Sequence, residues 1–99
     1  MTFRVRYTKK ARDDQRRLYE YLLKRDQAVA RRAIEKIAKG IELLKEFPFT
    51  CRKASPDSPF LRELLISFGS AGYVLLFEIE DATTVTILAV RHQREDDYM

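Results

Sequence analysis

The chain of 99 residues is poor in cysteine, histidine and glycine, and each shortage excludes a kind of site. The single Cys51 cannot form a disulfide within the chain, and no spacing of Cys, His and Asp is typical of a zinc site. There is no glycine-rich phosphate loop and no Gly-x-Ser-x-Gly elbow. We therefore expect no metal site, no cofactor and no nucleophilic cysteine.

The sequence also lacks the long apolar segments of membrane proteins. No apolar run approaches the ~20 residues that a membrane-spanning helix needs. No basic n-region followed by an apolar h-region and a cleavage site opens the chain. Together with the single cysteine, these absences favour the reducing cytoplasm as the compartment, and we expect no membrane partner.

What the chain does contain is typical of a folded protein with acidic partners. Hydrophobic residues make up 45% of the chain, far from the composition of disordered proteins. At this length residues 1–99 can form one core and not two, which predicts a single domain. Lys and Arg number 19 against 15 acidic residues, so the formal net charge is +4. This bias favours nucleic acid or an acidic protein segment as a partner.

One strand and two helices are predicted in the first half of the chain. Alternation of apolar and polar residues predicts a strand at residues 2–7. Helical spacing then runs from Thr8 to Lys24 and again from Asp26 to Phe47, and Thr8 and Asp26 are both suitable N-caps. The short connection predicts an antiparallel helical hairpin. In the second helix, the residues expected to pack in the core are Ile34, Ile37, Ile41 and Leu44, with Gly40 as a point of close packing.

The second half is predicted to be a loop followed by a sheet. Residues 49–60 hold two prolines and two serines without an apolar period, so we expect a loop that is long enough to move. Residues 61–68, 73–79 and 84–90 are typical of strands joined by short turns, which gives an antiparallel meander. The order β-α-α-β-β-β predicts an α+β fold, with a helical hairpin on one face of a small, mainly antiparallel sheet.

Three short motifs occur along these elements. They are Leu61-Arg62-Glu63-Leu64, Gly72-Tyr73-Val74-Leu75 and the run from Ile87 through Tyr98. With the order of the elements, they make nearly the whole chain similar to the RelE/ParE superfamily of toxins from bacterial type II toxin-antitoxin systems. The resemblance implies a small basic protein encoded beside an antitoxin, whose C-terminal segment wraps the toxin and silences it.

The resemblance implies one of two activities. Members similar to RelE cut ribosome-bound mRNA. In them the scissile phosphate is held by cations on the strand before a Gly-Tyr turn and by an Arg directly after the Gly-Tyr pair. Members similar to ParE inhibit DNA gyrase and hydrolyse nothing. Here Val74 follows Gly72-Tyr73, and the preceding strand, residues 64–68, carries no cation. Because loss of one preorganised donor commonly costs ~10²–10³ in rate, we predict a ParE-like inhibitor of DNA gyrase without enzymatic activity.

The alternative is a RelE-like, ribosome-dependent and metal-independent endoribonuclease that acts on mRNA. Its catalytic residues would be His92, Arg94 and Tyr98, which offer an imidazole, a guanidinium and a phenol. In the favoured prediction none of these is catalytic. The candidates for contact with the target or the antitoxin are then Arg52, Lys53, Arg62, Arg91, His92, Arg94 and Tyr98.

Each of these candidates also has an ordinary structural explanation. His92 can simply hydrogen-bond the chain as it leaves the sheet, and Tyr98 can hold the C-terminal segment on the sheet. The acidic run Glu95-Asp96-Asp97 would repel a nucleic-acid backbone or pair with neighbouring arginines. Arg62 either forms an ion pair with Glu63 across strands or faces the same groove as Arg94.

A partner is expected to cover part of the surface. A sheet this small leaves unpaired edge groups and exposed apolar surface beside the helices. In the resemblance the cover is a cognate antitoxin, an initially disordered and usually acidic segment that folds on binding. Its charge would complement the net +4 of this chain.

Overall fold

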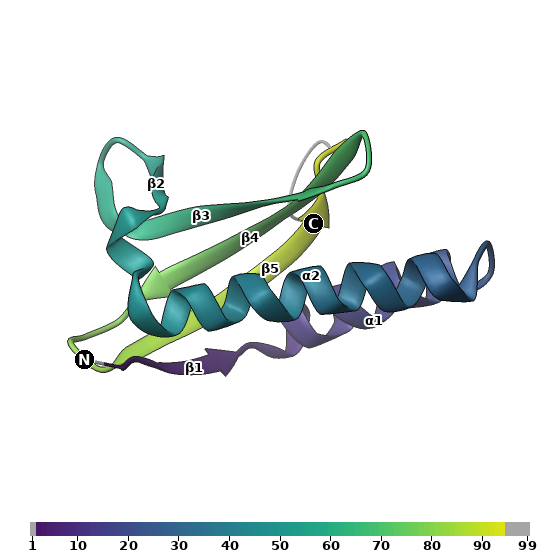
Figure 1. Cartoon of the computed structure of the whole chain (residues 1–99). Coiled ribbons are helices and arrows are strands. Elements are labelled where there is room, and N and C mark those ends of the chain that lie inside the picture. The colour runs from purple at the N-terminus through teal and green to yellow at the C-terminus, as the bar shows by residue number, and fades with distance from the viewer. Residues whose placement is uncertain (1, 95–99) are drawn as a thin grey trace.

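The computed structural model describes residues 2–94 and contains two long helices and five strands (Figure 1). The first half holds β1 (Arg4–Tyr7), α1 (Lys9–Leu23) and α2 (Gln27–Glu46). The second half holds a single 3-10 turn, η1 (Pro48–Thr50), and then β2 (Arg52–Ser55), β3 (Ser58–Phe68), β4 (Ala71–Ile79) and β5 (Thr84–His92).

The strands form one mixed sheet in the order β1-β5-β4-β3-β2. Strands β2 to β5 pair antiparallel, and β1 pairs parallel with β5. Helices α1 and α2 run side by side along one face of the sheet (Figure 1). The predicted α+β fold, with a helical hairpin on a mainly antiparallel sheet, is therefore confirmed.

Both helices begin where the sequence predicts. Thr8 Oγ1 accepts a hydrogen bond from the Ala11 N–H at 3.1 Å, and Asp26 Oδ1 accepts one from the Ala28 N–H at 2.9 Å. Each cap satisfies a backbone donor that has no partner within the helix. The caps therefore fix the starts of the helices and, with them, the short turn that makes α1 and α2 antiparallel neighbours.

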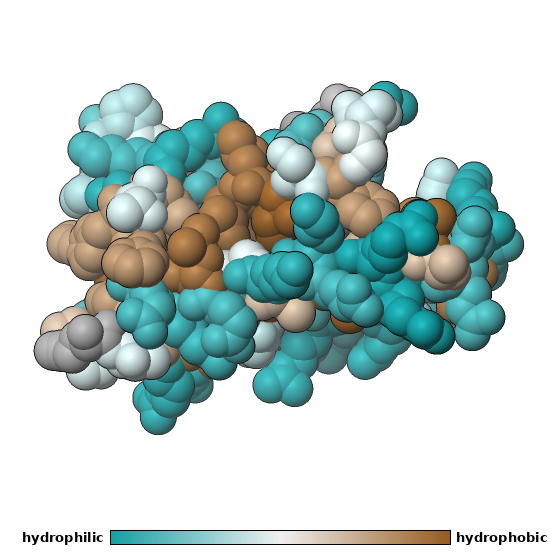
Figure 2. All heavy atoms as spheres, viewed as in Figure 1, coloured by the Kyte–Doolittle hydropathy of each residue, from teal (hydrophilic) through white to brown (hydrophobic). Residues whose placement is uncertain are grey.

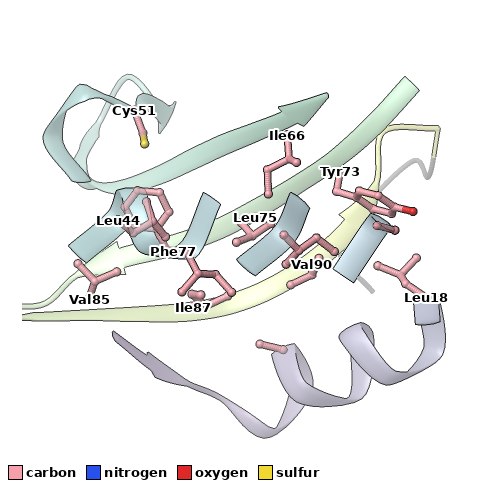
Figure 3. Packing of buried hydrophobic residues seen from close by; sticks show 14 of the residues in the cluster. Leu18, Leu44, Cys51, Ile66, Tyr73, Leu75, Phe77, Val85, Ile87 and Val90 are labelled. Atoms are coloured by element: carbon pink, nitrogen blue, oxygen red, sulfur yellow. The ribbon is translucent and has the colours of Figure 1, made fainter. Parts of the chain in front are cut away.

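The core lies between the helices and the sheet (Figure 3). Ile37, Ile41 and Leu44 of α2 are buried in it, but Ile34 is 38% exposed, so the prediction that all four apolar residues of this stripe are core was wrong for Ile34. Gly40 is a point of close packing, because a Cβ there would lie 2.8 Å from Ile66 Cδ1 of β3. From the sheet, the buried residues that meet the helices include Tyr73, Leu75, Phe77, Val85, Ile87 and Val90.

The segment 49–60 is not the irregular loop that its composition predicts. It contains η1, strand β2 and the start of β3. Arg62 explains the difference, because its guanidinium donates to Phe49 O at 3.2 Å, to Cys51 O at 2.7 Å and to Pro59 O at 2.7 Å. These bonds hold η1 and β2 against β3. An exposed edge strand needs no apolar period, so composition gave no sign of β2.

Strand β5 carries one extra residue opposite β4. Leu76 pairs with Ala89 and Phe77 pairs with Ile87, so Leu88 has no partner across the ladder. Pairing with β1 ends at Ile87, and beyond it the buried Val90 N–H donates to Asp14 Oδ2 of α1 at 3.0 Å. Asp14 is only 7% exposed and also accepts from Lys10 Nζ at 2.9 Å. A buried carboxylate thus connects α1 to the last residues of β5.

Candidate functional site

The last residues of β5 border a cleft between α1 and the sheet. The cleft has a volume of about 340 Å³ and opens beside the turn that joins β3 to β4. Apolar and aromatic side chains form most of its wall, and the two arginines come from α1 and from the turn that follows it. The lining residues are Arg17, Leu18, Tyr21, Leu22, Arg25, Phe68, Tyr73 and His92.

His92 is held in this cleft by several contacts. It lies opposite Tyr73 in the β4–β5 ladder, and the two rings meet edge to face at 5.6 Å between centroids. His92 Nδ1 accepts a hydrogen bond from the Arg94 N–H at 3.2 Å. The neutral ring therefore carries its proton on Nε2. This arrangement suits a ring that holds the end of β5, whereas a general base would need an unprotonated nitrogen aimed at a substrate.

Arg91 projects from the opposite face of the sheet. It pairs with Val74, which pairs with Leu65 of β3 on its other side. Because side chains alternate along a strand and Tyr73 and Leu75 face the helices, these three residues lie on the face of the sheet opposite α1 and α2. Arg91 Nη1 donates to His92 O at 3.3 Å and to Gln93 O at 3.4 Å. Arg91 and His92 are adjacent in the sequence, but their side chains lie on opposite faces of the sheet.

Sequence reasoning missed the contribution of α1 to the cleft. Arg17 and Tyr21 lie four residues apart on one side of α1, and Arg25 follows in the turn after the helix. The Arg25 guanidinium lies 3.9 Å from the centroid of the Tyr21 ring, a cation–π contact, and Arg17 Nη2 lies 3.8 Å from Asp14 Oδ1. The spacing of four was visible in the sequence. An apolar cleft with a basic rim suits an apolar side chain that is flanked by a carboxylate.

Burial makes two other reactive groups poor catalysts. Desolvation raises the pKa of the Cys51 thiol and the pKa of the Tyr73 phenol. Both groups therefore stay protonated at neutral pH, and neither is a ready nucleophile or base. Within residues 2–94, no group of three His, Cys, Asp or Glu side chains is placed to hold a metal ion.

The remaining basic candidates lie at the other end of β3. Arg52 pairs with Glu63 at 2.9 Å, and Lys53 is exposed on β2. Arg62 is held by the backbone carbonyls described above. In the ladder Arg62 lies opposite Phe77, whereas the His92 end of the sheet lies four residues further along β3, roughly 13 Å away. Both predictions for Arg62 were wrong. Arg62 forms no ion pair with Glu63, and it does not face the same groove as Arg94.

This end of the molecule also exposes several large apolar side chains. Figure 2 shows apolar surface gathered over the C-terminal half of α2 and the neighbouring end of the sheet. The rings of Phe49 and Phe60 meet nearly perpendicularly at 6.3 Å, and the Arg62 guanidinium lies 5.5 Å from the centroid of Phe49. We call this surface the aromatic patch. Its members are Leu43 (42% exposed), Phe47 (54%), Phe49 (51%) and Phe60 (52%).

The outcome for the candidates of the sequence analysis is therefore mixed. The structure separates Arg91, His92 and Arg94 at one end from Arg52, Lys53 and Arg62 at the other. Arg94 is exposed, and its backbone N–H holds the His92 ring. Tyr98 and the acidic run 95–97 lie outside the described residues. No helix within residues 2–94 is long and apolar enough to cross a membrane.

The chain on which the cleft and the aromatic patch lie matches the toxins of type II toxin-antitoxin systems. Residues 5–97 match the family described as "ParE toxin of type II toxin-antitoxin system, parDE", so the chain belongs to this family of the RelE/ParE superfamily. Membership implies a cognate antitoxin.

A curated relative and a solved structure agree with this assignment. The Caulobacter vibrioides protein named Toxin RelE3 is 38% identical over 87 residues, which cover 87% of this chain and 89% of the relative. The solved structure titled "Chromosomal ParDE TA system from P. aeruginosa" matches with a TM-score of 0.71 at 18% identity, over 96% of this chain and 98% of that one. At that identity the structural match supports the fold alone.

Proposed function

We propose that this toxin acts in the cytoplasm as a single domain that inhibits DNA gyrase and cleaves no RNA. The observation that carries the proposal is the face of the sheet around Val74. Val74 is 2% exposed, and its neighbour in the ladder on β3 is the apolar Leu65. In the RelE-like pattern this position holds an Arg at the scissile phosphate. The chain instead has the buried apolar Val74 at this position, beside the 46% exposed side chain of Leu65.

The placement of the other groups supports the same proposal. Cleavage of RNA needs a base, an acid and a cation around one phosphate, each within hydrogen-bond reach. His92 lies in the cleft on the helix side, whereas Arg91 lies on the opposite face of the sheet beside Val74. Arg91 and His92 therefore do not converge on one phosphate. An inhibitor needs only a complementary surface, and the basic rim of the cleft offers one.

The test is DNA supercoiling by purified gyrase, run beside mRNA cleavage on translating ribosomes. We expect the wild type to inhibit supercoiling or trap cleavage complexes while mRNA stays intact. Arg25→Ala should weaken inhibition by about tenfold, because its guanidinium forms the rim of the cleft. Arg94→Ala serves as the control for the ribonuclease alternative. Unaffected gyrase together with mRNA that is cut by the wild type and spared by this control would overturn the proposal.

We further propose that the antitoxin docks on the aromatic patch. Exposed rings in contact with each other are typical anchors of an interface, and they lie beside the exposed Lys53. An acidic segment that folds on binding would bury the rings and complement the charge. Strand β2 is also a free sheet edge that can pair with an added strand.

Phe60→Ala should therefore weaken binding of the protein encoded by the neighbouring gene by at least about 30-fold, which corresponds to roughly 2 kcal/mol. Calorimetric titration measures the effect. Leu23→Ala removes an equally accessible apolar side chain, 40% exposed, at the opposite end of the molecule and should leave affinity unchanged. Similar losses in both variants would argue against the patch.

A further inference from the structure

A second basic surface lies on α2, away from both the cleft and the aromatic patch. Arg32, Lys36 and Lys39 line one side of a shallow hollow of about 420 Å³. The other side is formed by Ser67 and the residues of the turn after β3. Figure 2 shows hydrophilic surface along this part of α2. The hollow is open and predominantly positive.

These three cations differ from those of α1. Lys9, Lys10 and Arg16 each lie within 2.9–3.8 Å of an aspartate, so their charge is largely compensated locally. Within residues 2–94, the row on α2 has no ion-pair partner. Uncompensated cations that border one hollow create a positive potential there, and such a potential attracts anions.

The spacing of the row fits a nucleic-acid backbone. Positions 32, 36 and 39 share one side of the helix, and seven residues of helix extend over about 10.5 Å. Along one strand of duplex DNA a phosphate occurs about every 3.4 Å of helix axis. The row therefore reaches about three successive phosphates. We propose that Arg32, Lys36 and Lys39 bind the phosphate backbone of duplex DNA without sequence preference.

The walls of the hollow favour a duplex over other polyanions. A peptide partner needs apolar anchors, and single-stranded nucleic acid needs rings on which bases stack. Phe68 is the aromatic residue at this surface, and it is partly buried against the core. The exposed phenylalanines lie at the far end of α2. Backbone contacts to a duplex require cations and no anchor. The inference extends the proposed function, because it places DNA itself in contact with the toxin.

Binding to a fluorescent duplex of about 20 base pairs, measured by anisotropy on the full chain without gyrase, tests the inference. With three phosphate contacts, the logarithm of affinity should fall with the logarithm of salt at a slope of about −2.7. The wild type should thus lose about 40-fold between roughly 50 and 200 mM salt. The triple variant Arg32→Ala/Lys36→Ala/Lys39→Ala should lose most of its binding and most of this slope.

Two further variants make the test specific. Lys9→Ala/Arg16→Ala/Lys45→Ala removes the same charge from cations that are already paired, so it should keep affinity within about twofold. Glu35→Gln removes a carboxylate that lines the same hollow and should tighten binding several-fold. Circular dichroism confirms that each variant is folded.

Three results would overturn the inference. Equal losses in the two triple variants would show that net charge alone is responsible. A polyglutamate peptide that competes as well as unlabelled duplex would identify an acidic protein surface as the partner. Tighter binding of single-stranded RNA than of the duplex would assign the hollow to RNA. Because gyrase is absent, none of these results depends on the gyrase proposal.

Discussion

Gly72→Ala should destabilise the protein by at least about 3 kcal/mol, since this glycine leaves no room for a side chain. A Cβ at this position would lie 2.0 Å from the backbone oxygen of Ile66, and backbone cannot move aside as a flexible side chain can. The β3–β4 turn would have to shift. Gly72 O also accepts the Gln93 N–H at 2.9 Å, so the shift would loosen the end of β5.

Thermal unfolding measures this effect. For a domain of this size, about 3 kcal/mol corresponds to a drop in Tm of roughly 12–24 °C. Gly69→Ala is the matched control: Gly69 has φ of +63°, but no atom lies within 4 Å of an added Cβ. Its cost is then the backbone penalty alone, about 1 kcal/mol. A Gly72→Ala protein that melts as high as Gly69→Ala would contradict the steric argument.

Asp14→Ala should cost about 2–3 kcal/mol, although it removes only a small polar side chain. The substitution leaves the Val90 N–H without its acceptor, and Val90 is 0% exposed. A buried donor that loses a charged acceptor loses the bond and also carries its desolvation penalty. The link between α1 and the end of β5 would be lost, and His92 would lose part of its support.

Amide hydrogen exchange gives the most direct measurement, because the Val90 N–H should exchange faster in the variant by about the factor that the lost stability implies. Asp13→Ala is the control: the neighbouring Asp13 side chain is 46% exposed and pairs with Lys9 on the surface. Such pairs contribute well under 1 kcal/mol. Asp14→Asn keeps an acceptor oxygen and should retain much of the protection. Equal exchange in the Asp13 and Asp14 variants would refute the buried link.

The regular elements were predictable because their signals are local. The caps at Thr8 and Asp26 and the helical periodicities need only a few neighbouring residues, and the structure confirms them. Strand β2 was not predictable in this way. It exists because Arg62, ten residues along the chain from Arg52, holds the preceding carbonyls. Ile34 shows a related limit, since periodicity identifies the side of a helix but not where the sheet beneath it stops.

The candidate site was predictable only in part. Its position at the end of the last strand was expected, and His92 does lie there. Side chains alternate between the two faces of a strand, so the placement of Arg91 and His92 on opposite faces could have been predicted from the sequence. The contribution of α1 did not follow, because Tyr21 and His92 are brought together only when β5 packs between β1 and β4. Contacts between residues that are far apart in the sequence leave no pattern in the neighbouring residues.

The position of β5 in the sheet also has a temporal consequence. Residues 4–7 pair with residues 84–87, so a chain growing on the ribosome holds its first strand without a partner for about eighty residues. At roughly 5–20 residues per second this interval lasts roughly 4–16 s. The strand that joins β1 to the rest of the sheet is thus the last of the five to be made, and neither the cleft nor the complete sheet exists before it. A cognate antitoxin that is present during this interval can bind the toxin as soon as its sheet is complete.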